Sequence, residues 1–423
     1  MKTNFFFTFA FIGLAMTSFS QKKNTASNEV KPLFDASTVG SLAFRNVGPA
    51  LTSGRVSDLA IHPKHSNKWY VAAASGGVWY TENHGTTFSP IFDGYGSYSI
   101  ACVELAPSNP STVWVGTGEN NNQRSVAYGD GVYKSVDGGK SFTNMGLGKS
   151  EHIGNIIIHP SNENIVWVAA YGPVWSAGGE RGVYKSMDGG KTWERTLFIS
   201  EETGISEIAI DPTNPDILYA AAHQRRRQEW TYIGGGPESA IYKSVDGGKT
   251  WKEVNAGLPK GEMGRIGLAV SPADPTYVYA IIEGRTDKGG FFRSTNKGEN
   301  WSKMSSFNTS GNYYQEIMCD PNDKNKVFAM DTYLHHTEDG GKNFKATGES
   351  KKHVDNHAIW IDPNNTDHWL VGCDGGIYET YNHAQDWRYY DNLPIIQFYK
   401  VVTDNSSPFY NIYGGTQDNN SMG

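Results

Sequence analysis

The chain is poor in cysteine, in positive charge and in long apolar runs. Its 423 residues include three cysteines, Cys102, Cys319 and Cys373, which are far apart and odd in number. Such a set does not form a disulfide framework, and the apolar sequence around each thiol predicts small buried hydrophobic residues. The 44 acidic residues outnumber the 37 basic ones. A mildly acidic chain has no electrostatic basis for binding nucleic acid, so that class of partner is excluded.

The apolar stretch near the N-terminus is too short to cross a membrane comfortably. Residues 1–20 combine the basic Lys2, an apolar core at 5–16 and small residues around Ser20. This order is typical of a signal peptide, so we predict cleavage near Ser20 and export to the periplasm, the cell surface or the medium. No membrane span is expected after cleavage. The polar residues 21–40 are expected to form a flexible leader.

The chain is rich in glycine and aromatic residues, many of them in an octapeptide that occurs seven times. The copy Ser-Val-Asp-Gly-Gly-Lys-Thr-Trp at 244–251 recurs closely at 135–142 and 186–193. Looser copies begin at residues 81, 294, 337 and 380, so that successive copies start 43 to 58 residues apart. A repeat of this length indicates one supersecondary unit copied around a ring or along a solenoid.

Each octapeptide is expected to be a tight turn between two strands. Its glycines tolerate positive φ, and its hydroxyl and carboxylate side chains accept hydrogen bonds from the turn backbone. The aromatic residue at its eighth position is expected to pack between neighbouring sheets. Seven copies cannot all be one active site, so we interpret the aspartates of the turns as structural: Asp137, Asp188, Asp246 and Asp339.

A second marker, an apolar run that ends in proline, precedes each octapeptide, as in Ile-Ala-Ile-Asp-Pro at 208–212. A further apolar run follows the proline, and two strands flank the octapeptide. Four strands in this order form an antiparallel meander, which is a propeller blade. The sequence therefore predicts an all-β fold, a seven-bladed β-propeller of four-stranded antiparallel blades over residues 41–396. The blades are expected to begin near residues 55, 100, 154, 205, 265, 314 and 357.

The octapeptide resembles the Asp-box, also called the BNR repeat, of sialidases, sortilin-type receptors and xyloglucanase-like glycosidases. Together with Phe-Arg-Asn-Val-Gly-Pro at 44–49, it makes the chain most similar to secreted bacterial proteins grouped with the sortilin N-terminal domain and labelled glycosyl hydrolases. Members of this group tend to carry a second propeller. Residues 397–423 contain two expected strands, 397–402 and 410–413, without a further octapeptide. We interpret this segment as an incomplete further unit, the start of a truncated second propeller.

Length variation between the repeats is concentrated in the link between the second and third strands. Blades 2, 3 and 4 carry insertions there, at 119–130, 172–181 and 223–239. In an antiparallel meander this link lies on the face opposite the octapeptide turns. Three adjacent blades are therefore expected to raise their insertions on one face, which we call the inserted face, and long loops on a rigid scaffold are where function usually lies.

The insertions bring together aromatic, arginine and carboxylate side chains, which suit a sugar or a peptide ligand. The candidate ligand-binding residues are Glu119, Arg124, Tyr128, Trp175, Glu180, Arg225, Arg226, Arg227, Trp230 and Tyr232. Trp230 and Tyr232 alternate, so on an extended segment they would present one aromatic side. The arginines are expected to pair with Glu180 or Glu119, or with an anionic group of the ligand. The alternative is a solvated loop that its aromatic residues hold down.

Two other groups of residues could carry chemistry. His353, Asp355 and His357 alternate, and on an extended backbone they could hold zinc, but we interpret them as hydrogen-bonded loop residues and expect no metal and no cofactor. The resemblance to xyloglucanase-like enzymes implies one catalytic aspartate on the first strand of the first blade. That position falls on Ser57 here, with Asp58 next to it, and the second aspartate would belong to a second propeller.

The sequence favours an exported propeller that binds an extracellular glycan or peptide on the inserted face. One alternative is a glycoside hydrolase of xyloglucanase-like type, active only with a second propeller, and another is a structural scaffold. Two loop carboxylates about 5–10 Å apart across an open groove would favour the hydrolase. No catalytic residue is assigned from the sequence.

Overall fold

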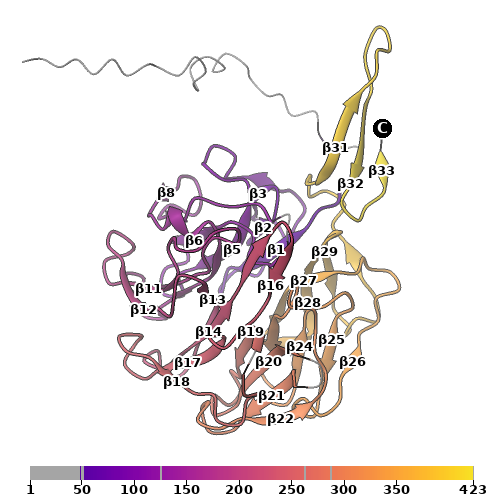
Figure 1. Cartoon of the computed structure of the whole chain (residues 1–423). Helices are drawn as coiled ribbons and strands as arrows, with labels where there is room; N and C mark the ends of the chain where they lie inside the picture. The colour runs from indigo at the N-terminus through magenta and orange to yellow at the C-terminus, as the bar shows by residue number, and fades with distance from the viewer. Residues whose placement is uncertain (1–47, 49–51, 124–125, 262, 286–287, 423) are drawn as a thin grey trace, which may run out of the picture. The chain divides into compact units, whose positions relative to one another are not determined.

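The computed structural model describes residues 48, 52–123, 126–261, 263–285 and 288–422 (Figure 1). The expected signal peptide and leader lie outside the described residues, as does Arg124. The described chain consists of strands and turns apart from one short 3-10 helix, η1 (Gly148–Ser150). It contains no helix with the length and apolar character needed to span a membrane.

Seven four-stranded antiparallel sheets, blades 1 to 7, follow one another along the chain. Blade 1 consists of β1 (Val56–Ile61), β2 (Trp69–Ala73), β3 (Gly77–Thr81) and β4 (Ser89–Pro90). Blade 2 consists of β5 (Ile100–Leu105), β6 (Val113–Thr117), β7 (Val132–Ser135) and β8 (Thr143–Asn144). Blade 3 consists of β9 (Ile153–Ile158), β10 (Val166–Ala170), β11 (Gly182–Ser186) and β12 (Glu194–Leu197). Blade 4 consists of β13 (Thr203–Ile210), β14 (Leu218–Gln224), β17 (Ala240–Ser244) and β18 (Lys252–Glu253).

The remaining blades have the same order of strands. Blade 5 consists of β19 (Met263–Val270), β20 (Val278–Gly284), β21 (Gly290–Ser294) and β22 (Ser302–Ser305). Blade 6 consists of β23 (Ile317–Cys319), β24 (Val327–Ala329), β25 (His335–Thr337) and β26 (Lys345–Ala346). Blade 7 consists of β27 (Asn356–Asp362), β28 (Asn365–Cys373), β29 (Gly376–Thr380) and β30 (Arg388–Tyr389). Every blade begins within a few residues of its expected start.

The hydrophobic core lies between the blades, because each sheet buries both of its faces against its neighbours. Ala72 and Val78 of blade 1 pack against Val103 of blade 2, and equivalent clusters fill each following interface. Val56 of blade 1 packs with Leu370 of blade 7, so the last interface closes a ring. The prediction of an all-β, seven-bladed β-propeller is confirmed.

The octapeptides form the expected turns between the third and fourth strands. In the copy at 244–251, Asp246 accepts hydrogen bonds from the backbone N–H and the hydroxyl of Thr250, at 2.9 and 2.6 Å. Gly247 and Gly248 have φ of 71° and 76°, which favours glycine. The indole N–H of Trp251 donates to Thr196 Oγ1 of the preceding blade at 3.2 Å. Equivalent backbone bonds are made by Asp137, Asp188 and Asp339.

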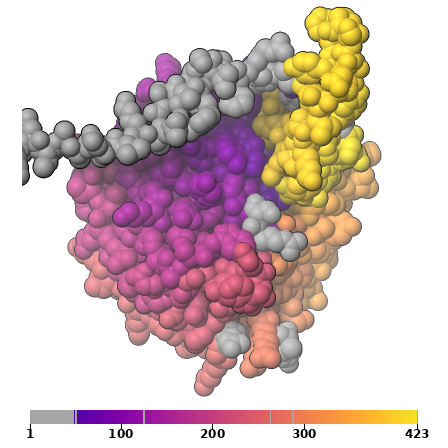
Figure 2. All heavy atoms as spheres, turned by 45° about the horizontal axis from the view of Figure 1, so that its top comes forward, coloured from indigo at the N-terminus to yellow at the C-terminus, as the bar shows by residue number. Residues whose placement is uncertain are grey.

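A separate three-stranded sheet follows blade 7 and consists of β31 (Phe398–Thr403), β32 (Ile412–Thr416) and β33 (Ser421–Met422). The sequence predicted two strands here and missed β33, which is two residues long. Figure 2 shows this sheet (yellow) beside blade 7 (orange). The loop between β32 and β33 contacts blade 7, since Asn419 Nδ2 donates to the carbonyl oxygen of Asp374 at 3.1 Å.

Candidate functional site

The three inserted loops pack against one another on one face of the propeller. Arg225 of the blade 4 insertion donates to the carbonyl oxygens of Asn121 in blade 2, at 2.9 Å, and of Gly172 in blade 3, at 3.0 Å. Arg227 donates to the carbonyl oxygen of Asn122 from both Nε, at 3.0 Å, and Nη2, at 2.9 Å. The antiparallel order of the strands therefore predicted correctly that these loops lie on one face. Whether that face binds a ligand stays a prediction.

Arg225 is an internal part of this loop layer. Its side chain is fully buried, and its guanidinium lies 3.3 Å from the ring centroid of Tyr171. Burial lowers the pKa of Arg225 to about 10, so the group still carries its charge at neutral pH. The charge is held by carbonyl oxygens and an aromatic face, and it ties the three insertions together.

Arg226, the next residue, also has a partner within the loops. Arg226 makes a two-pronged ion pair with Glu202, with Nε 3.0 Å from Oε2 and Nη2 2.5 Å from Oε1. Arg226 therefore does not pair with Glu180 or Glu119 as expected, and Glu180 accepts the backbone N–H of Lys149 at 2.9 Å. Glu119 instead lies beside Arg55, with 3.6 Å between Oε2 and Nη1.

The expected aromatic platform of Trp230 and Tyr232 does not form. The segment is a hairpin of β15 (Arg226–Gln228) and β16 (Thr231–Ile233), and Trp230 lies in its turn with 77% of its surface exposed. Tyr232 lies under the guanidinium of Arg227, with 4.1 Å to the ring centroid, and receives a hydrogen bond from Asn122. Residues 226–233 contain neither glycine nor proline, so the sequence did not indicate a turn here.

Exposed aromatic side chains of the described blades are nevertheless concentrated on the inserted face. The antiparallel order of each blade puts the link between its second and third strands, and the link to the next blade, at this face. These links carry the exposed residues Tyr98, Tyr128, Trp175, Phe198, Trp230 and Tyr333. Among the exposed large aromatic residues of the described blades, the turns of the opposite face carry Tyr381 alone.

A buried ionic cluster lies beside the blade 2 insertion, and the sequence did not predict it. Arg55, just before β1, donates from Nε and Nη2 to Asp374 of blade 7, at 2.6 and 2.8 Å. His357 Nε2 lies 2.8 Å from the same carboxylate. Burial alone would raise the pKa of Asp374, but the bond from Arg55 and the charge of His357 hold it well below its usual range. Asp374 is therefore an ionised, fully bonded carboxylate.

Two further carboxylates approach Asp374. The oxygens of Asp355, Asp374 and Asp418 lie within 4.8 Å of one another, and the hydroxyl of Tyr314 bonds to Asp355. Asp418 comes from the loop between β32 and β33. Burial and then the neighbouring Asp374 raise the pKa of Asp418. Three carboxylates this close repel one another, and protonation of Asp418 relieves that repulsion.

The zinc arrangement considered for His353, Asp355 and His357 is absent from the described structure. Asp355 has a left-handed φ of 64°, so the backbone is not extended and the three side chains do not share one side. His353 Nδ1 lies 2.8 Å from the carbonyl oxygen of Val354, whereas His357 faces Asp374.

A central channel is lined by the first strands of all seven blades and contains a cavity of about 220 Å³. Ser57 and Asp58 both line it, because a β-bulge between Val56 and Asp58 interrupts the alternation of β1. Burial raises the pKa of Asp58 to about 6 and that of Glu104 to about 8. Glu104 therefore holds its proton at neutral pH, whereas Asp58 is mostly ionised there, and the first strands of the blades surround both groups.

The geometry defines a β-propeller whose inserted loops build a rigid polar layer with exposed aromatic residues on one face. No family model matches the chain. Over 274 residues it is 24% identical to a "probable oligoxyloglucan-reducing end-specific xyloglucanase" of Neosartorya fischeri, which covers 57% of this chain and 30% of that protein. Over 244 residues it is 25% identical to the xyloglucanase Xgh74A of Acetivibrio thermocellus, covering 49% of this chain and 28% of that protein. These alignments span about a third or less of the relatives' length.

Solved structures with the same fold include a GH74 xyloglucanase from Xanthomonas campestris. It has a TM-score of 0.64 and 16% identity, covering 89% of this chain and 60% of the other. The GH74 enzyme of Niastella koreensis has a TM-score of 0.63 at 18% identity, covering 89% of this chain and 59% of its own. YCF48 bound to D1 peptide has a TM-score of 0.53 at 15% identity, covering 80% of this chain and 98% of the other. At these identities the likeness concerns the fold alone.

Proposed function

We propose that this chain is an exported Asp-box propeller whose inserted face binds a β-glucan chain of the xyloglucan type. The observation that carries the proposal is the one-sided distribution of exposed aromatic residues, of which Trp175 and Trp230 are the largest. Indole and phenol rings stack on the apolar faces of sugar rings and lose little conformational entropy when they do so. The partial similarity to xyloglucanases supports this class of ligand.

A peptide or an acidic sugar fits this face less well than a neutral glucan. Recognition of a carboxylate needs arginine side chains that are open to the ligand. Arg225 is buried against backbone carbonyl oxygens, and Arg226 is already paired with Glu202 at 2.5 Å. These two arginines are thus engaged within the loop layer and do not face a ligand, whereas the exposed aromatic residues are open to one.

Hydrolysis is the second candidate function, and Glu119 and Asp374 are the carboxylates that favour it. They flank the guanidinium of Arg55, and burial raises the pKa of Glu119, as a general acid requires. Asp374 is a poor general base, because Arg55, His357 and Gln417 all bond to it. Catalysis within this chain therefore has weaker support than binding.

Calorimetric titration of the full chain with xyloglucan oligosaccharides tests the proposal. We expect binding, and we expect Trp175→Ala and Trp230→Ala each to weaken it at least about tenfold, as is usual for aromatic residues central to a site. The matched control is Tyr381→Ala, an exposed aromatic residue of the opposite face. Absence of binding, or equal loss in the control, would contradict the proposal. An assay for new reducing ends separates hydrolysis, which Glu119→Gln would abolish, from binding alone.

A further inference from the structure

Two positions of the repeat meet where successive blades pack together. The residue just before the octapeptide of one blade faces the fourth residue of the next blade's octapeptide. Lys134 Nζ donates to the carbonyl oxygen of Gly189 at 3.2 Å, between blades 2 and 3. Lys185 Nζ donates to the carbonyl oxygen of Gly247 at 2.7 Å, between blades 3 and 4. The pairing shared by these interfaces is a lysine with a glycine carbonyl.

Blades 6 and 7 differ from this pattern at both positions. His336 takes the place of the lysine and His383 the place of the glycine, while Glu338 is the second residue of the blade 6 octapeptide. His383 has a left-handed φ of 55°, which costs a side chain more than it costs glycine. The same position holds His84 in blade 1 and Lys297 in blade 5, each with φ of 57°, and each of these side chains lies 2.9 Å from a carboxylate. A side chain at this position is thus kept where a contact compensates for the strain.

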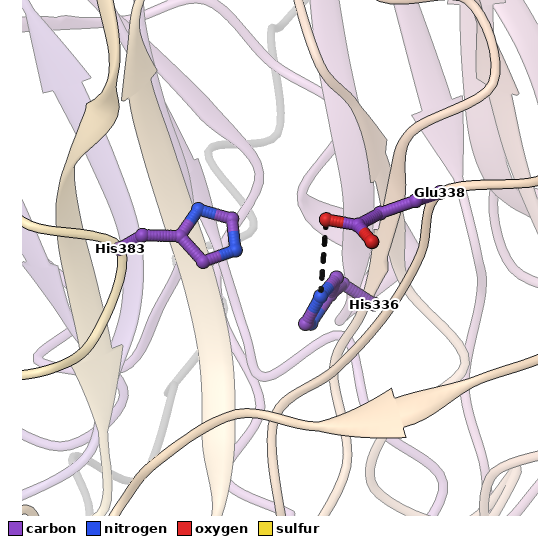
Figure 3. Close-up of side chains that lie close together, drawn as sticks. All are labelled: His336, Glu338 and His383. Atoms are coloured by element: carbon purple, nitrogen blue, oxygen red, sulfur yellow. Dashed lines mark ion pairs between the residues drawn. The ribbon is translucent and has the colours of Figure 1, made fainter.

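The three side chains converge at the interface of blades 6 and 7 (Figure 3). One ligand atom from each of His336, Glu338 and His383 lies within 4.8 Å of the other two. The rings of His336 and His383 are 5.3 Å apart between centroids and nearly perpendicular. Figure 3 shows a ring nitrogen of His383 turned towards the other two side chains.

Contacts within the protein pair Glu338 with Lys345, at 3.5 Å between Oε2 and Nζ, but leave His336 unsatisfied. His336 is 7% exposed, and its Nδ1 is buried with no hydrogen-bond partner among the described residues. His336 Nε2 lies 3.9 Å from Glu338 Oε1, which is longer than a hydrogen bond. A buried imidazole left in this way costs free energy unless another ligand engages it.

One ring nitrogen of His383 has polar neighbours. His383 Nδ1 lies 3.4 Å from Asp367 Oδ1 and 3.4 Å from Lys326 Nζ. With a cation on its other nitrogen, His383 would donate Nδ1–H to Asp367, the arrangement that commonly orients metal-binding histidines. Lys326 would keep its ion pair with Asp320, at 3.4 Å.

We propose that His336, Glu338 and His383 form a binding site for a zinc-type divalent cation that crosslinks blades 6 and 7. Two imidazoles and one carboxylate are ligands that Zn²⁺ accepts, and three protein ligands leave a position for water. Calcium and magnesium prefer sites built from oxygen atoms and fit this set poorly. Glu338 is exposed and His383 is half-buried, so an ion can enter from solvent. The site lies on the face of the octapeptide turns and is independent of glycan binding.

Titration of metal-stripped, tag-free full chain with Zn²⁺ tests this site. We expect the chain to bind one equivalent of Zn²⁺. Binding should raise the melting temperature of the protein, because an ion bound to the folded state stabilises it. The variants His383→Gly and His336→Lys restore the residues that other blades carry, so both should fold. Each should bind that equivalent at least about tenfold more weakly, since even loss of an outer-shell partner costs about 10- to 100-fold.

The matched control is His65→Ala, which removes an exposed histidine in the turn between β1 and β2 and should leave zinc binding unchanged. Melting temperatures without zinc show whether each variant is folded. The proposal is overturned if the parent binds no zinc, or if both variants bind it as tightly as the parent does. Calcium binding at these residues in preference to zinc would overturn it as well.

Discussion

The aspartates of the octapeptide turns accept hydrogen bonds from the turn backbone and do not form a reactive group. Asp246 accepts four hydrogen bonds or more from its own turn, including those from Ser244 Oγ and Thr250 N–H. Three copies have asparagine at this position, and Asn296 Oδ1 accepts the same backbone bond from Asn300 at 3.0 Å. The repeat therefore requires an acceptor at this position and does not require a negative charge.

We predict that Asp246→Ala lowers the free energy of unfolding by about 1–2 kcal/mol, because several turn donors lose their acceptor. Asp246→Asn should lose clearly less, since its amide oxygen keeps the backbone bond. Urea denaturation of the three proteins measures both values. If Asp246→Ala keeps its stability but loses glycan binding, the structural interpretation of these aspartates is wrong.

The interface of blades 7 and 1 contains one buried carboxylate with several partners beside its apolar cluster. Glu379 of β29 lies 2.9 Å from His84 Nε2 of blade 1 and 2.9 Å from His368 Nε2 of blade 7. Burial alone would raise the pKa of Glu379, but His368, His84 and Tyr390 hold it well below its usual range. Burial would lower the pKa of His368, and the bond to Glu379 raises it instead.

This network predicts how stability depends on pH. The contribution of Glu379 is present above the unfolded glutamate pKa of about 4.3 and is lost as pH falls below it. The contribution of His368 is complete below the unfolded histidine pKa of about 6.5 and is lost as pH rises through its folded pKa. The stability difference between the parent and Glu379→Gln should therefore be largest between these values. A difference that keeps growing above pH 7 in urea denaturation would contradict this.

The β31–β33 sheet differs from the blades in what it buries. All six residues of β31 are exposed, including Tyr399 and Val402, whereas the first strands of the blades are mostly buried. The backbone hydrogen bonds of the β31–β33 sheet should open readily, because few apolar contacts hold them.

Hydrogen exchange should therefore show weaker protection in β31 and β32 than in any second strand of a blade. The contact of Asn419 with Asp374 should give the loop between β32 and β33 at most intermediate protection. Protection of β31 equal to that of β28 would show that this sheet is part of the stable ring.

At the scale of the whole molecule, the sequence predicted the blades because two local markers recur in each of them. Strand parity then placed the insertions on one face, since that argument needs only the order of strands. The cluster of Arg55 and Asp374 could not be found in this way, because its members are 319 residues apart and meet through ring closure. The hairpin turn at Trp230 was missed for a different reason, since tryptophan is not a strong turn former. The left-handed backbone at Asp355 was missed because the alternating pattern was taken as extended, although aspartate tolerates this conformation.

The central claim is that the inserted face binds a glucan, and hydrogen exchange with and without a xyloglucan oligosaccharide tests it most directly. We expect the ligand to protect the insertions at 119–130, 172–181 and 223–239, since bound sugars exclude water from the loops that carry Tyr128, Trp175 and Trp230. The octapeptide turns on the opposite face should exchange at unchanged rates. Protection confined to those turns, or no protection at saturating ligand, would contradict the account.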